Sequence, residues 1–455
     1  HLLIISDEFA ELKTQQPEFM DQLISTARIG RSLGVHLILA TQKPSGIVND
    51  QIRSNSRFKI CLKVQEKSDS MDVINTADAA MLKQPGRFYL QVGYNEYYAL
   101  GQSAFAGAPY IPSDKLQKKV DKSINFINNI GATIKEVEEI PKFNLTVKGE
   151  QVTNIVKYLS DIAKMNNIKI KQLWLSKIPG IIKIKDLLEK YNYQKSNKLN
   201  IVIGEYDDPF NQRKDALEYN LLTDGNLVIH GVTGSGKEML LSTIIYGIIT
   251  NYSALECNIY ILDFGTNMLK MYKDMPQVGD FIVDDNPDKI NNLFKMLNDE
   301  IDYRKKILQE SGSSYSEYIK NNNLPLIVVI LNNYEVFNEL YNDYDDEIIS
   351  LTREGLKYGI TFIVTTTSSS LRYKLVQNFA QRLVLRMNDE SDYSSILGNV
   401  NKLYPAKFIG RGLMKKEGIY EFQTATIEED NLQEYIDTLE IELNQKYKEK
   451  AKKVP

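Results

Sequence analysis

Two distant stretches of the chain follow one pattern, and this internal repeat restricts the possible folds more than any other feature. Each copy contains an apolar run, a segment with helical spacing and a second apolar run, at residues 2–42 and 327–367. The same number of residues separates every matched pair, namely Asp7 and Asn332, Arg28 and Arg353, Gly34 and Gly359, and Gln42 and Thr367. Chance rarely keeps register across two strands and a helix, so we interpret the stretches as two copies of one structural unit.

The apolar runs of each copy indicate a parallel sheet. They are nearly continuous in Ile, Val and Leu, as strands are when helices cover both faces of a sheet. Their alternation with helical segments is typical of a doubly wound α/β domain. The second copy also has an upstream strand at 226–230, a helix at 237–250 and a strand at 258–262. The equivalent half of the first copy would precede His1, so we expect the first domain to be truncated at its N-terminus.

The composition suits a soluble globular chain. Charged residues are 25% and hydrophobic residues 43% of the chain, as in ordinary globular proteins. The length of 455 residues is enough for two or three domains. No apolar run reaches the roughly 18 residues that a transmembrane helix needs. Cys61 and Cys257 lie far apart in apolar runs, which predicts buried thiols in a reducing compartment and no disulfide or zinc site. The net charge of −4 makes nucleic acid an unlikely partner.

A glycine-rich segment of the second copy fits the G-x-x-x-x-G-K pattern of a P-loop. A strand precedes it and a helix follows, which is the context that this motif requires. The glycines let the backbone wrap around phosphates, and successive N–H groups form an anion nest at the helix N-terminus. We therefore expect ATP as the cofactor; a glycine-rich turn without a ligand is the alternative. The expected nucleotide-binding residues are Gly231, Val232, Thr233, Gly234, Ser235, Gly236, Lys237 and Glu238.

Glu238 departs from the P-loop pattern. A Ser or Thr normally follows the lysine and ligates Mg²⁺ through its hydroxyl. A carboxylate is larger, repels the phosphates beside it and can neutralise Lys237. We therefore expect no intact metal site in the second domain, whereas Mg²⁺ is expected in the first.

The first copy has the polar groups of a catalytic site at the ends of its strands. Asp7 is expected to hold Mg²⁺ through water, and Glu8 to polarise the attacking water. Gln42 ends the adjacent strand, where a polar sensor of the γ-phosphate belongs. Arg31 is a candidate arginine finger for a neighbouring site. These four residues are the expected catalytic residues of the first domain.

The second copy lacks all four of these groups. Asn332, Asn333, Leu356 and Thr367 stand where the first copy has Asp7, Glu8, Arg31 and Gln42. Neutral amides neither balance the charge of Mg²⁺ nor accept a proton from water. We therefore interpret the second site as degenerate. Asp263 ends another strand of this copy, and it is either structural or faces the nucleotide.

The residues that carry a family resemblance lie in both copies. The stretch Arg28-x-Gly30-Arg31-Ser32-Leu33-Gly34, continued by Ala40-Thr41-Gln42-Lys43-Pro44, resembles the characteristic segment of the FtsK/SpoIIIE branch of P-loop motors. Within that branch the chain resembles EssC/EccC, the ATPases of type VII (ESX-like) secretion. The tandem layout carries this closer resemblance, together with Trp174-Leu175, Asp207-Asp208-Pro209-Phe210-Asn211-Gln212 and Asp224-Gly225-Asn226.

The resemblance implies tandem RecA-like domains and a role in protein export. Such ATPases carry membrane segments and a further ATPase domain, which lie outside this chain. They act at the cytoplasmic face of the bacterial cell membrane as hexamers, with other membrane components of the secretion system, and export small helical WXG-type proteins. Their C-terminal ATPase domain docks a substrate's C-terminal signal, and nucleotide sites there are often degenerate.

We predict four regions along the chain. Residues 1–115 form the C-terminal half of an FtsK-type ATPase domain whose P-loop is missing, and residues 201–430 form a second, degenerate one. A connector at 116–200 contains an amphipathic helix, and a charged helical tail at 431–455 is expected to be frayed at its end. The apolar face of the connector helix comprises Val152, Ile155, Val156, Leu159 and Ile162.

Two other functions stay open on the sequence. An FtsK-like DNA translocase needs a basic channel and usually a DNA-reading winged-helix tail, which an acidic chain of this pattern does not favour. A structural adaptor with relic ATPase folds would have no use for the acids, arginine and glutamine that the first copy keeps. ATP hydrolysis by this chain also stays open, because neither domain has a complete catalytic site.

Overall fold

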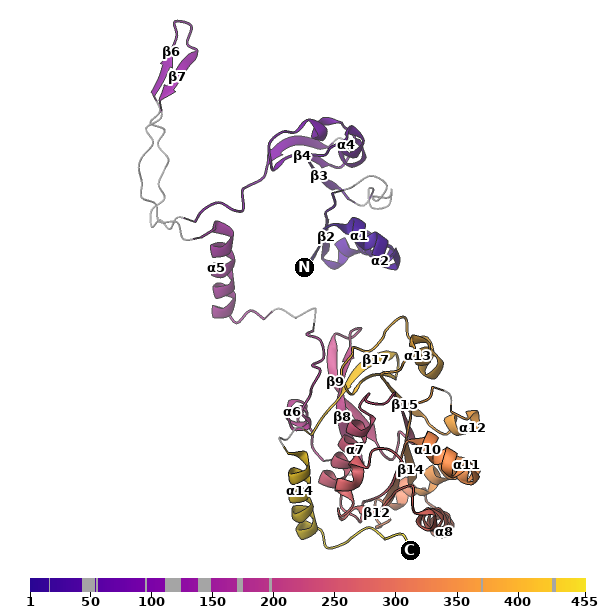
Figure 1. The fold of residues 1–455 in the computed structure, drawn as a ribbon. Coiled ribbons are helices and arrows are strands. Elements are labelled where there is room, and N and C mark those ends of the chain that lie inside the picture. Colours follow the sequence, from indigo (N-terminus) through magenta and orange to yellow (C-terminus); the bar gives the residue numbers. More distant parts are fainter. Residues whose placement is uncertain are drawn as a thin grey trace. The chain divides into compact units, whose positions relative to one another are not determined.

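The computed structural model describes residues 1–15, 17–42, 54, 56–94, 96–110, 124–137, 149–169, 175–195, 199–369, 371–427 and 431–455. The chain divides into two compact units, His1–Ile170 and Lys171–Pro455, which are coloured along the sequence in Figure 1. Within the described residues, no helix has both the length and the apolar content needed to cross a bilayer.

The first unit contains a parallel pair of strands followed by antiparallel strands. Strands β1 (Leu2–Ser6) and β2 (Val35–Leu39) pair in parallel, and α1 (Phe9–Gln15), α2 (Pro17–Ile29) and the 3₁₀ helix η1 (Gly30–Leu33) connect them. An antiparallel sheet follows, with α4 (Lys67–Ile74) and η2 (Asp78–Met81) inserted after its first strand. Its strands are β3 (Phe58–Leu62), β4 (Arg87–Val92) and β5 (Tyr97–Gln102). The hairpin β6 (Ile124–Ile127) and β7 (Thr133–Val137) and helix α5 (Gln151–Met165) complete the described elements.

The second unit is built on one sheet of ten strands in the order β12-β11-β13-β14-β10-β15-β16-β17-β8-β9. The strands from β12 to β15 are mutually parallel, and the remaining strands pair antiparallel. The parallel strands are β10 (Leu227–His230), β11 (Cys257–Asp263), β12 (Val278–Ile282), β13 (Leu326–Asn332), β14 (Ile360–Thr366) and β15 (Gln381–Leu385). The antiparallel strands are β8 (Asn200–Asp208), β9 (Arg213–Asn220), β16 (Arg411–Lys415) and β17 (Ile419–Thr424).

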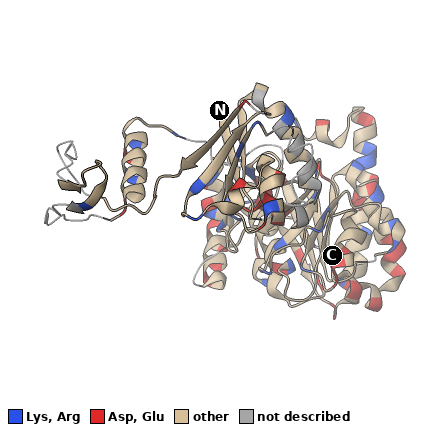
Figure 2. Ribbon diagram, turned by 90° about the horizontal axis from the view of Figure 1, so that it is seen from above, with Lys and Arg blue, Asp and Glu red and all other residues tan. Residues whose placement is uncertain are grey.

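Helices connect the parallel strands and cover both faces of the sheet (Figure 1). The longest is α8 (Pro287–Ser311), whose N-cap Asn286 accepts a hydrogen bond from the backbone N–H of Lys289. Basic and acidic residues are intermixed along the helices (Figure 2), as is usual for solvated faces. The remaining helices of the second unit are α6 (Ile184–Lys190), α7 (Lys237–Asn251), η3 (Met268–Tyr272), α9 (Tyr315–Tyr318), α10 (Tyr334–Leu340), η4 (Asn342–Tyr344), α11 (Asp345–Glu354), η5 (Gly355–Tyr358), α12 (Tyr373–Val376), α13 (Glu390–Leu397) and α14 (Leu432–Lys446).

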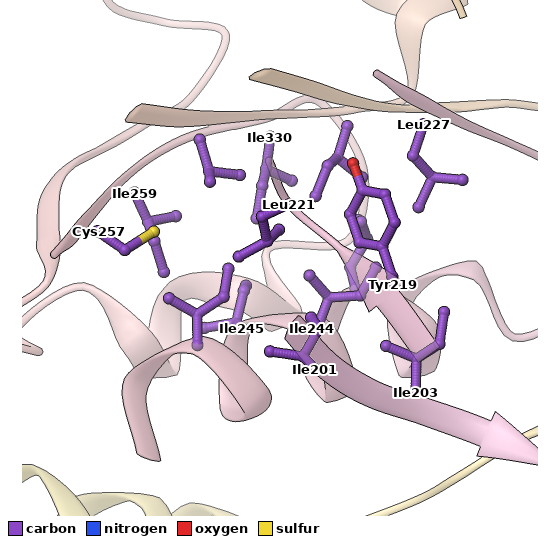
Figure 3. Close-up of a cluster of buried hydrophobic side chains, with 14 of the residues drawn as sticks. Ile201, Ile203, Tyr219, Leu221, Leu227, Ile244, Ile245, Cys257, Ile259 and Ile330 are labelled. Carbon is purple, nitrogen blue, oxygen red and sulfur yellow. The ribbon is translucent and has the colours of Figure 1, made fainter. Parts of the chain in front are cut away.

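The core of the second unit forms on both sides of the sheet because successive strand residues point to opposite faces. In β13, Val328 and Ile330 belong to the cluster that includes α7, whereas Val329 and Leu331 belong to the cluster that includes α8, α10 and α11. Figure 3 shows Ile244 and other side chains of the first cluster packed together. Burial on both faces explains why these strands are apolar throughout.

Strands β1 and β2 of the first unit are parallel and joined by helices, as are β13 and β14 of the second. Leu2 lies opposite Val35 in the β1–β2 pair, and Ile327 lies opposite Ile360 in the β13–β14 pair. Gly34 and Gly359 precede the second strand of each pair with the same positive φ of 72°, a conformation that favours glycine. The predicted doubly wound α/β fold with a mainly parallel sheet is confirmed.

The predicted connector includes parts of both units. Helix α5 forms as predicted, and none of its described residues is buried. Beyond residue 175, in contrast, Ile178, Ile184 and Leu187 pack with Val202 and Ala425 of the second unit. Trp174, to which we assigned part of the family resemblance, lies outside the described residues, as do Lys43 and Pro44.

The expectation of a frayed C-terminal end is wrong. Ala451 and Val454 are buried, and the Tyr260 hydroxyl donates a hydrogen bond of 2.8 Å to the carbonyl of Lys452. The Ala451 N–H donates to the carbonyl of Pro276 at 2.8 Å. Two apolar side chains among the lysines therefore hold the last residues against the sheet and α8. Both Cys61 and Cys257 are buried free thiols, and their burial is as predicted.

Candidate nucleotide-binding site

The P-loop joins the carboxyl end of β10 to the start of α7, as the motif predicted. Strand β10 lies between β14 and β15 and is parallel to both. The Gly231 N–H donates to the carbonyl of Thr366, and the Val232 N–H donates to the carbonyl of Arg386, each at 3.0 Å. The loop therefore starts at the carboxyl ends of the parallel strands, where ligands bind in open α/β folds.

Two glycines of the loop adopt backbone conformations that other residues rarely reach. The φ angles of Gly234 and Gly236 are 73° and 104°. A Cβ on Gly236 would lie 2.5 Å from the backbone nitrogen of Gly410, and one on Gly231 would lie 2.4 Å from Oγ of Ser235. The tight path of the loop therefore depends on residues without side chains.

Lys237 lies inside the loop with 4% of its surface exposed. Its Nζ donates to the carbonyls of Gly231 at 2.6 Å and Val232 at 3.2 Å. Burial lowers the pKa of Lys237, and the carboxylates of Glu238 and Glu335 oppose that shift. The ammonium is thus held where an incoming phosphate would exchange for the two carbonyls. Ser235 Oγ is buried beside it without a hydrogen-bond partner in the described part of the chain.

A cavity of about 710 Å³ opens beside the loop. Val232 and Thr233 of the P-loop form one side of it, and the segment after β15 forms another. Sequence reasoning did not identify this cavity, because its lining comes from three separate segments. The other lining residues are Arg386, Met387, Asn388, Glu390, Tyr393, Tyr404, Pro405 and Lys407.

The structure brings Asn332 and Asn333 to the carboxyl end of β13, next to the end of β14. The Asn332 side chain donates to Oδ1 of Asp263 at 2.8 Å and accepts from the Thr365 hydroxyl at 2.7 Å. Asn333 has a φ of 68°, and its side chain donates to the carbonyl of Phe264 at 3.1 Å. Both amide side chains therefore form hydrogen bonds with residues at or near the ends of neighbouring strands.

The other two degenerate positions lie apart from these amides. Leu356 lies in η5 next to Gly225, in the loop that leads into β10. Thr367 follows β14 and is exposed. Its N–H donates at 3.0 Å to the carboxylate of Glu335, a residue that sequence reasoning missed because it lies two positions beyond the expected acid.

In the first unit, two of the four predicted catalytic residues contact each other. Glu8 accepts hydrogen bonds from the Thr41 hydroxyl at 2.7 Å and the Gln42 N–H at 3.1 Å. Asp7 is exposed just after β1. Arg31 lies in η1, and its side chain is outside the described part. The catalytic roles of these residues stay predictions.

The residues present do not form a complete protein cage for a metal ion. Among the described residues, no three His, Cys, Asp or Glu side chains are grouped to hold one. Mg²⁺ in nucleotide sites needs only one or two carboxylates, because the phosphates and water supply the remaining ligands. Buried carboxylate oxygens without hydrogen-bond partners occur in Asp263 and Glu335. The second unit therefore still has carboxylates of the kind that bind Mg²⁺ together with phosphates and water.

Comparisons with known proteins agree with this geometry. The model of the FtsK/SpoIIIE family matches residues 186–425. The type VII secretion system protein EssC of Staphylococcus aureus is 36% identical over 98% of this chain. The chain spans about 31% of the length of that relative.

Solved structures of type VII secretion ATPases share the fold. EssC (ATPases 2 and 3) from Geobacillus thermodenitrificans is 27% identical, with a TM-score of 0.57 over 62% of this chain and 55% of that one. The cytoplasmic domain of Thermomonospora curvata EccC has a TM-score of 0.75 at 23% identity, over 100% of this chain and 51% of that one. ATPases 2 and 3 of the same protein, in complex with a signal sequence peptide, have a TM-score of 0.52 at 24% identity, over 58% of this chain and 50% of that one.

These matches cover the P-loop, the parallel strands that carry it and the tandem arrangement. The expected fold and the expected relatives are both confirmed. The chain belongs to the FtsK/SpoIIIE family of P-loop motors, and its relatives within that family are the EssC/EccC ATPases of type VII secretion.

Proposed function

We propose that this chain is part of the ATP-binding motor of type VII protein secretion, with its nucleotide held at the P-loop of the second domain. The loop geometry carries the proposal, since Gly234 and Gly236 adopt positive φ angles and Lys237 is buried inside the loop. Backbone N–H groups at the start of α7 and the lysine ammonium are the groups that bind phosphates. The cavity beside Val232 and Thr233 then receives the nucleoside.

The secretion role follows from the relatives. By analogy with them, we propose that nucleotide binding or hydrolysis is coupled to the export of small helical WXG-type proteins. The working location is the cytoplasmic face of the bacterial cell membrane, in a hexamer that contacts other membrane components of the secretion system.

The second domain is proposed as the substrate-docking module. Its catalytic positions hold Asn332 and Asn333 instead of acids, which leaves binding as the role that selection would retain. The Thermomonospora curvata relative was solved with a signal sequence peptide on ATPases 2 and 3, and this supports a docking role for the matching part of the present chain.

Nucleotide binding is tested by titrating a fluorescent ATP analogue into the chain and its Lys237→Ala variant. We expect saturable binding to the unmodified chain and a loss of at least tenfold in affinity for the variant, because about 1.4 kcal/mol corresponds to tenfold and the lysine provides a charge-assisted contact. The exposed Lys320 gives a matched control, Lys320→Ala, which should bind normally. Equal binding by the unmodified chain and Lys237→Ala would contradict a P-loop site.

Docking is tested separately by a pull-down of WXG-type proteins from the same organism on the immobilised chain, at micromolar concentration. Enrichment of one or more of them is the expected result. The absence of any enrichment with folded protein would contradict the docking role and leave nucleotide binding unaffected.

A further inference from the structure

Two carboxylates of the second unit lie close to the positions where its acids are missing. Asn332 and Asn333 replace the acids that the first unit has as Asp7 and Glu8. Asp263 and Glu335 contact either these asparagines or the groups that the missing acids would contact. Their hydrogen bonds can be compared directly with those of the first unit.

Glu8 shows what the acid does in the first unit. Its carboxylate accepts from the Thr41 hydroxyl at 2.7 Å and from the Gln42 N–H at 3.1 Å. It therefore joins the end of β1 to the end of the adjacent strand β2. The repeat matches Thr41 with Thr366 and Gln42 with Thr367.

Glu335 makes the corresponding contacts in the second unit. Its Oε1 accepts from the Thr366 hydroxyl, from the Thr367 N–H at 3.0 Å and from the Ser368 N–H at 2.9 Å. The same two partners are thus bound by a carboxylate in both units. In the second unit the carboxylate comes from a residue two positions later, in α10.

Asn333, which corresponds to Glu8, forms hydrogen bonds with other partners. Asn333 shares the positive φ of Glu8, 68° against 54°, so the backbone at the strand end is alike in both units. Its side chain donates to the carbonyl of Phe264, after β11. Its N–H donates at 2.8 Å to the Thr365 hydroxyl. Asn333 therefore leaves the contacts with Thr366 and Thr367 to Glu335.

Asp263 is placed to replace the other missing acid. It ends β11 directly opposite Asn332, which ends β13. Its Oδ1 accepts from the Asn332 side chain at 2.8 Å and from the Gly265 N–H at 3.0 Å. The amide of Asn332 is itself oriented by the Thr365 hydroxyl, so Asn332 and Asp263 form a fixed pair at the ends of the two strands.

Each of the two carboxylates keeps one oxygen unused. Oδ2 of Asp263 and Oε2 of Glu335 are buried and have no hydrogen-bond partner among the described residues, and Asp263 is only 2% exposed. A buried carboxylate oxygen without a partner costs free energy, and carboxylate oxygens are among the ligands that Mg²⁺ prefers. Burial lowers the pKa of Lys237 and of His230, and the carboxylate of Glu335 opposes both shifts, which places its charge in the P-loop region.

We propose that the second nucleotide site has displaced its acidic pair and has not lost it: Asp263 takes the place of the acid absent at 332, Glu335 takes the place of the acid absent at 333, and together they bind the Mg²⁺ of a bound nucleotide. This inference rests on the proposed nucleotide binding. Oε1 of Glu335 already accepts from three donors, and Oε2 is the oxygen that would bind the metal, so Glu335 has no oxygen left to act as a base for an attacking water. The displaced pair therefore supports binding without restoring hydrolysis.

The experiment measures how strongly Mg²⁺ promotes nucleotide binding. A non-hydrolysable ATP analogue is titrated into the full chain with and without Mg²⁺, for the unmodified protein, Asp263→Asn, Glu335→Gln and the double variant. Glu339→Gln, an exposed acid on the same helix, and Asp274→Asn, which is also exposed, are the matched controls. Thermal melting shows which variants fold, and if Asp263→Asn does not, Glu335→Gln and its control decide alone.

The expected result is a loss of about tenfold or more in apparent Mg²⁺ affinity for the double variant, the usual cost of removing groups that orient or bind a metal. Glu335→Gln should bind the nucleotide more tightly than the unmodified chain when Mg²⁺ is absent, because a negative charge near the phosphates is removed. Unchanged Mg²⁺ dependence in both single variants, with binding abolished in Lys237→Ala, would overturn the displaced pair and leave nucleotide binding intact. No binding by the unmodified chain would overturn the proposed function itself, and the inference with it.

Discussion

Asn332 donates a hydrogen bond of 2.8 Å to Asp263, and the two residues end adjacent parallel strands in register. In the first unit the position of Asn332 is held by Asp7, a single exposed acid. The second unit thus keeps the strand ends and the loop of a phosphate site while it rearranges the charges around them. This arrangement predicts nucleotide binding with little hydrolysis.

Restoring the lost groups should raise hydrolysis only when they are restored together. The triple variant Glu238→Thr, Asn332→Asp and Asn333→Glu returns a metal ligand, an acid for its outer shell and a general base, which alone contributes about 10²–10⁴-fold. Because such groups act as a unit, the triple variant should exceed every single variant in phosphate release. A single variant as active as the triple one would show that the other positions are not deficient.

The close approach of the P-loop to the β16 side should make Gly236 intolerant of a side chain. Gly236→Ala forces a non-glycine residue to a φ of 104° and places Cβ 2.5 Å from the nitrogen of Gly410. We expect a loss of about 1–3 kcal/mol in unfolding free energy and loss of nucleotide binding. At Gly418 a Cβ would come no closer than 3.4 Å to its surroundings, so Gly418→Ala is the control in denaturant unfolding. Equal stability of the two variants would contradict the tight loop path.

Arg304 of α8 is a buried connection between three segments of the second unit. Its guanidinium donates to the carbonyls of Tyr358 and Pro325 at 2.8 Å each and to Glu300 at 2.8 Å, and the side chain is fully buried. Arg304→Met should lower the unfolding free energy by about 3–5 kcal/mol, because these partners would be left buried or unpaired. Arg353→Met, at a side chain 62% exposed and paired with Glu354, should cost less than about 1 kcal/mol. Urea unfolding of both variants measures the contrast, and similar losses would contradict it.

The two cysteines should resist alkylation until the chain unfolds. Burial, with a smaller contribution from Asp69, raises the pKa of Cys61 from 9.0 to about 11, and burial also raises the pKa of Cys257. The thiolate is the reactive form, so at pH 8 the folded thiols carry less of it than the unfolded ones. The stabilisation that the neutral Cys61 thiol contributes is complete below pH 9 and declines as the pH rises toward 11.

Iodoacetamide labelling at pH 8, read by mass spectrometry with and without denaturant, checks this prediction for both units at once. We expect labelling only in denaturant. Fast labelling of Cys61 alone under native conditions would show that the sheet of β3, β4 and β5 does not bury it.

Most of the fold could be predicted because its signals are local. The apolar run of β13 and the alternation of strands and helices predict a parallel sheet, and the spacing of Gly231, Gly236 and Lys237 predicts the loop. The predicted repeat also places Asn332 and Asn333 at a strand end, where the structure has them. Gly34 and Gly359, which the predicted repeat pairs with each other, share a φ of 72°.

The hydrogen bonds that link the ends of different strands could not be predicted from the sequence. Glu335 binds Thr366 and Thr367 across a long stretch of chain, and only the folded sheet brings these residues together. Asp263 could be structural or nucleotide-facing on the sequence, and its pairing with Asn332 depends on β11 lying next to β13. The buried C-terminal end depends likewise on tertiary contacts of Ala451 and Val454, which a run of lysines conceals.

Phosphate release by the purified chain with ATP and Mg²⁺, measured beside its Lys237→Ala variant, tests the central claim most directly. Kinases, which also transfer phosphoryl groups, turn over about 1–100 times per second. Because position 333 has no free base and position 238 lacks the usual metal-binding hydroxyl, we predict hydrolysis near or below detection in a chain that still binds the nucleotide. Turnover of about one per second or faster, abolished by Lys237→Ala, would show that the second site is a working ATPase and would contradict the account.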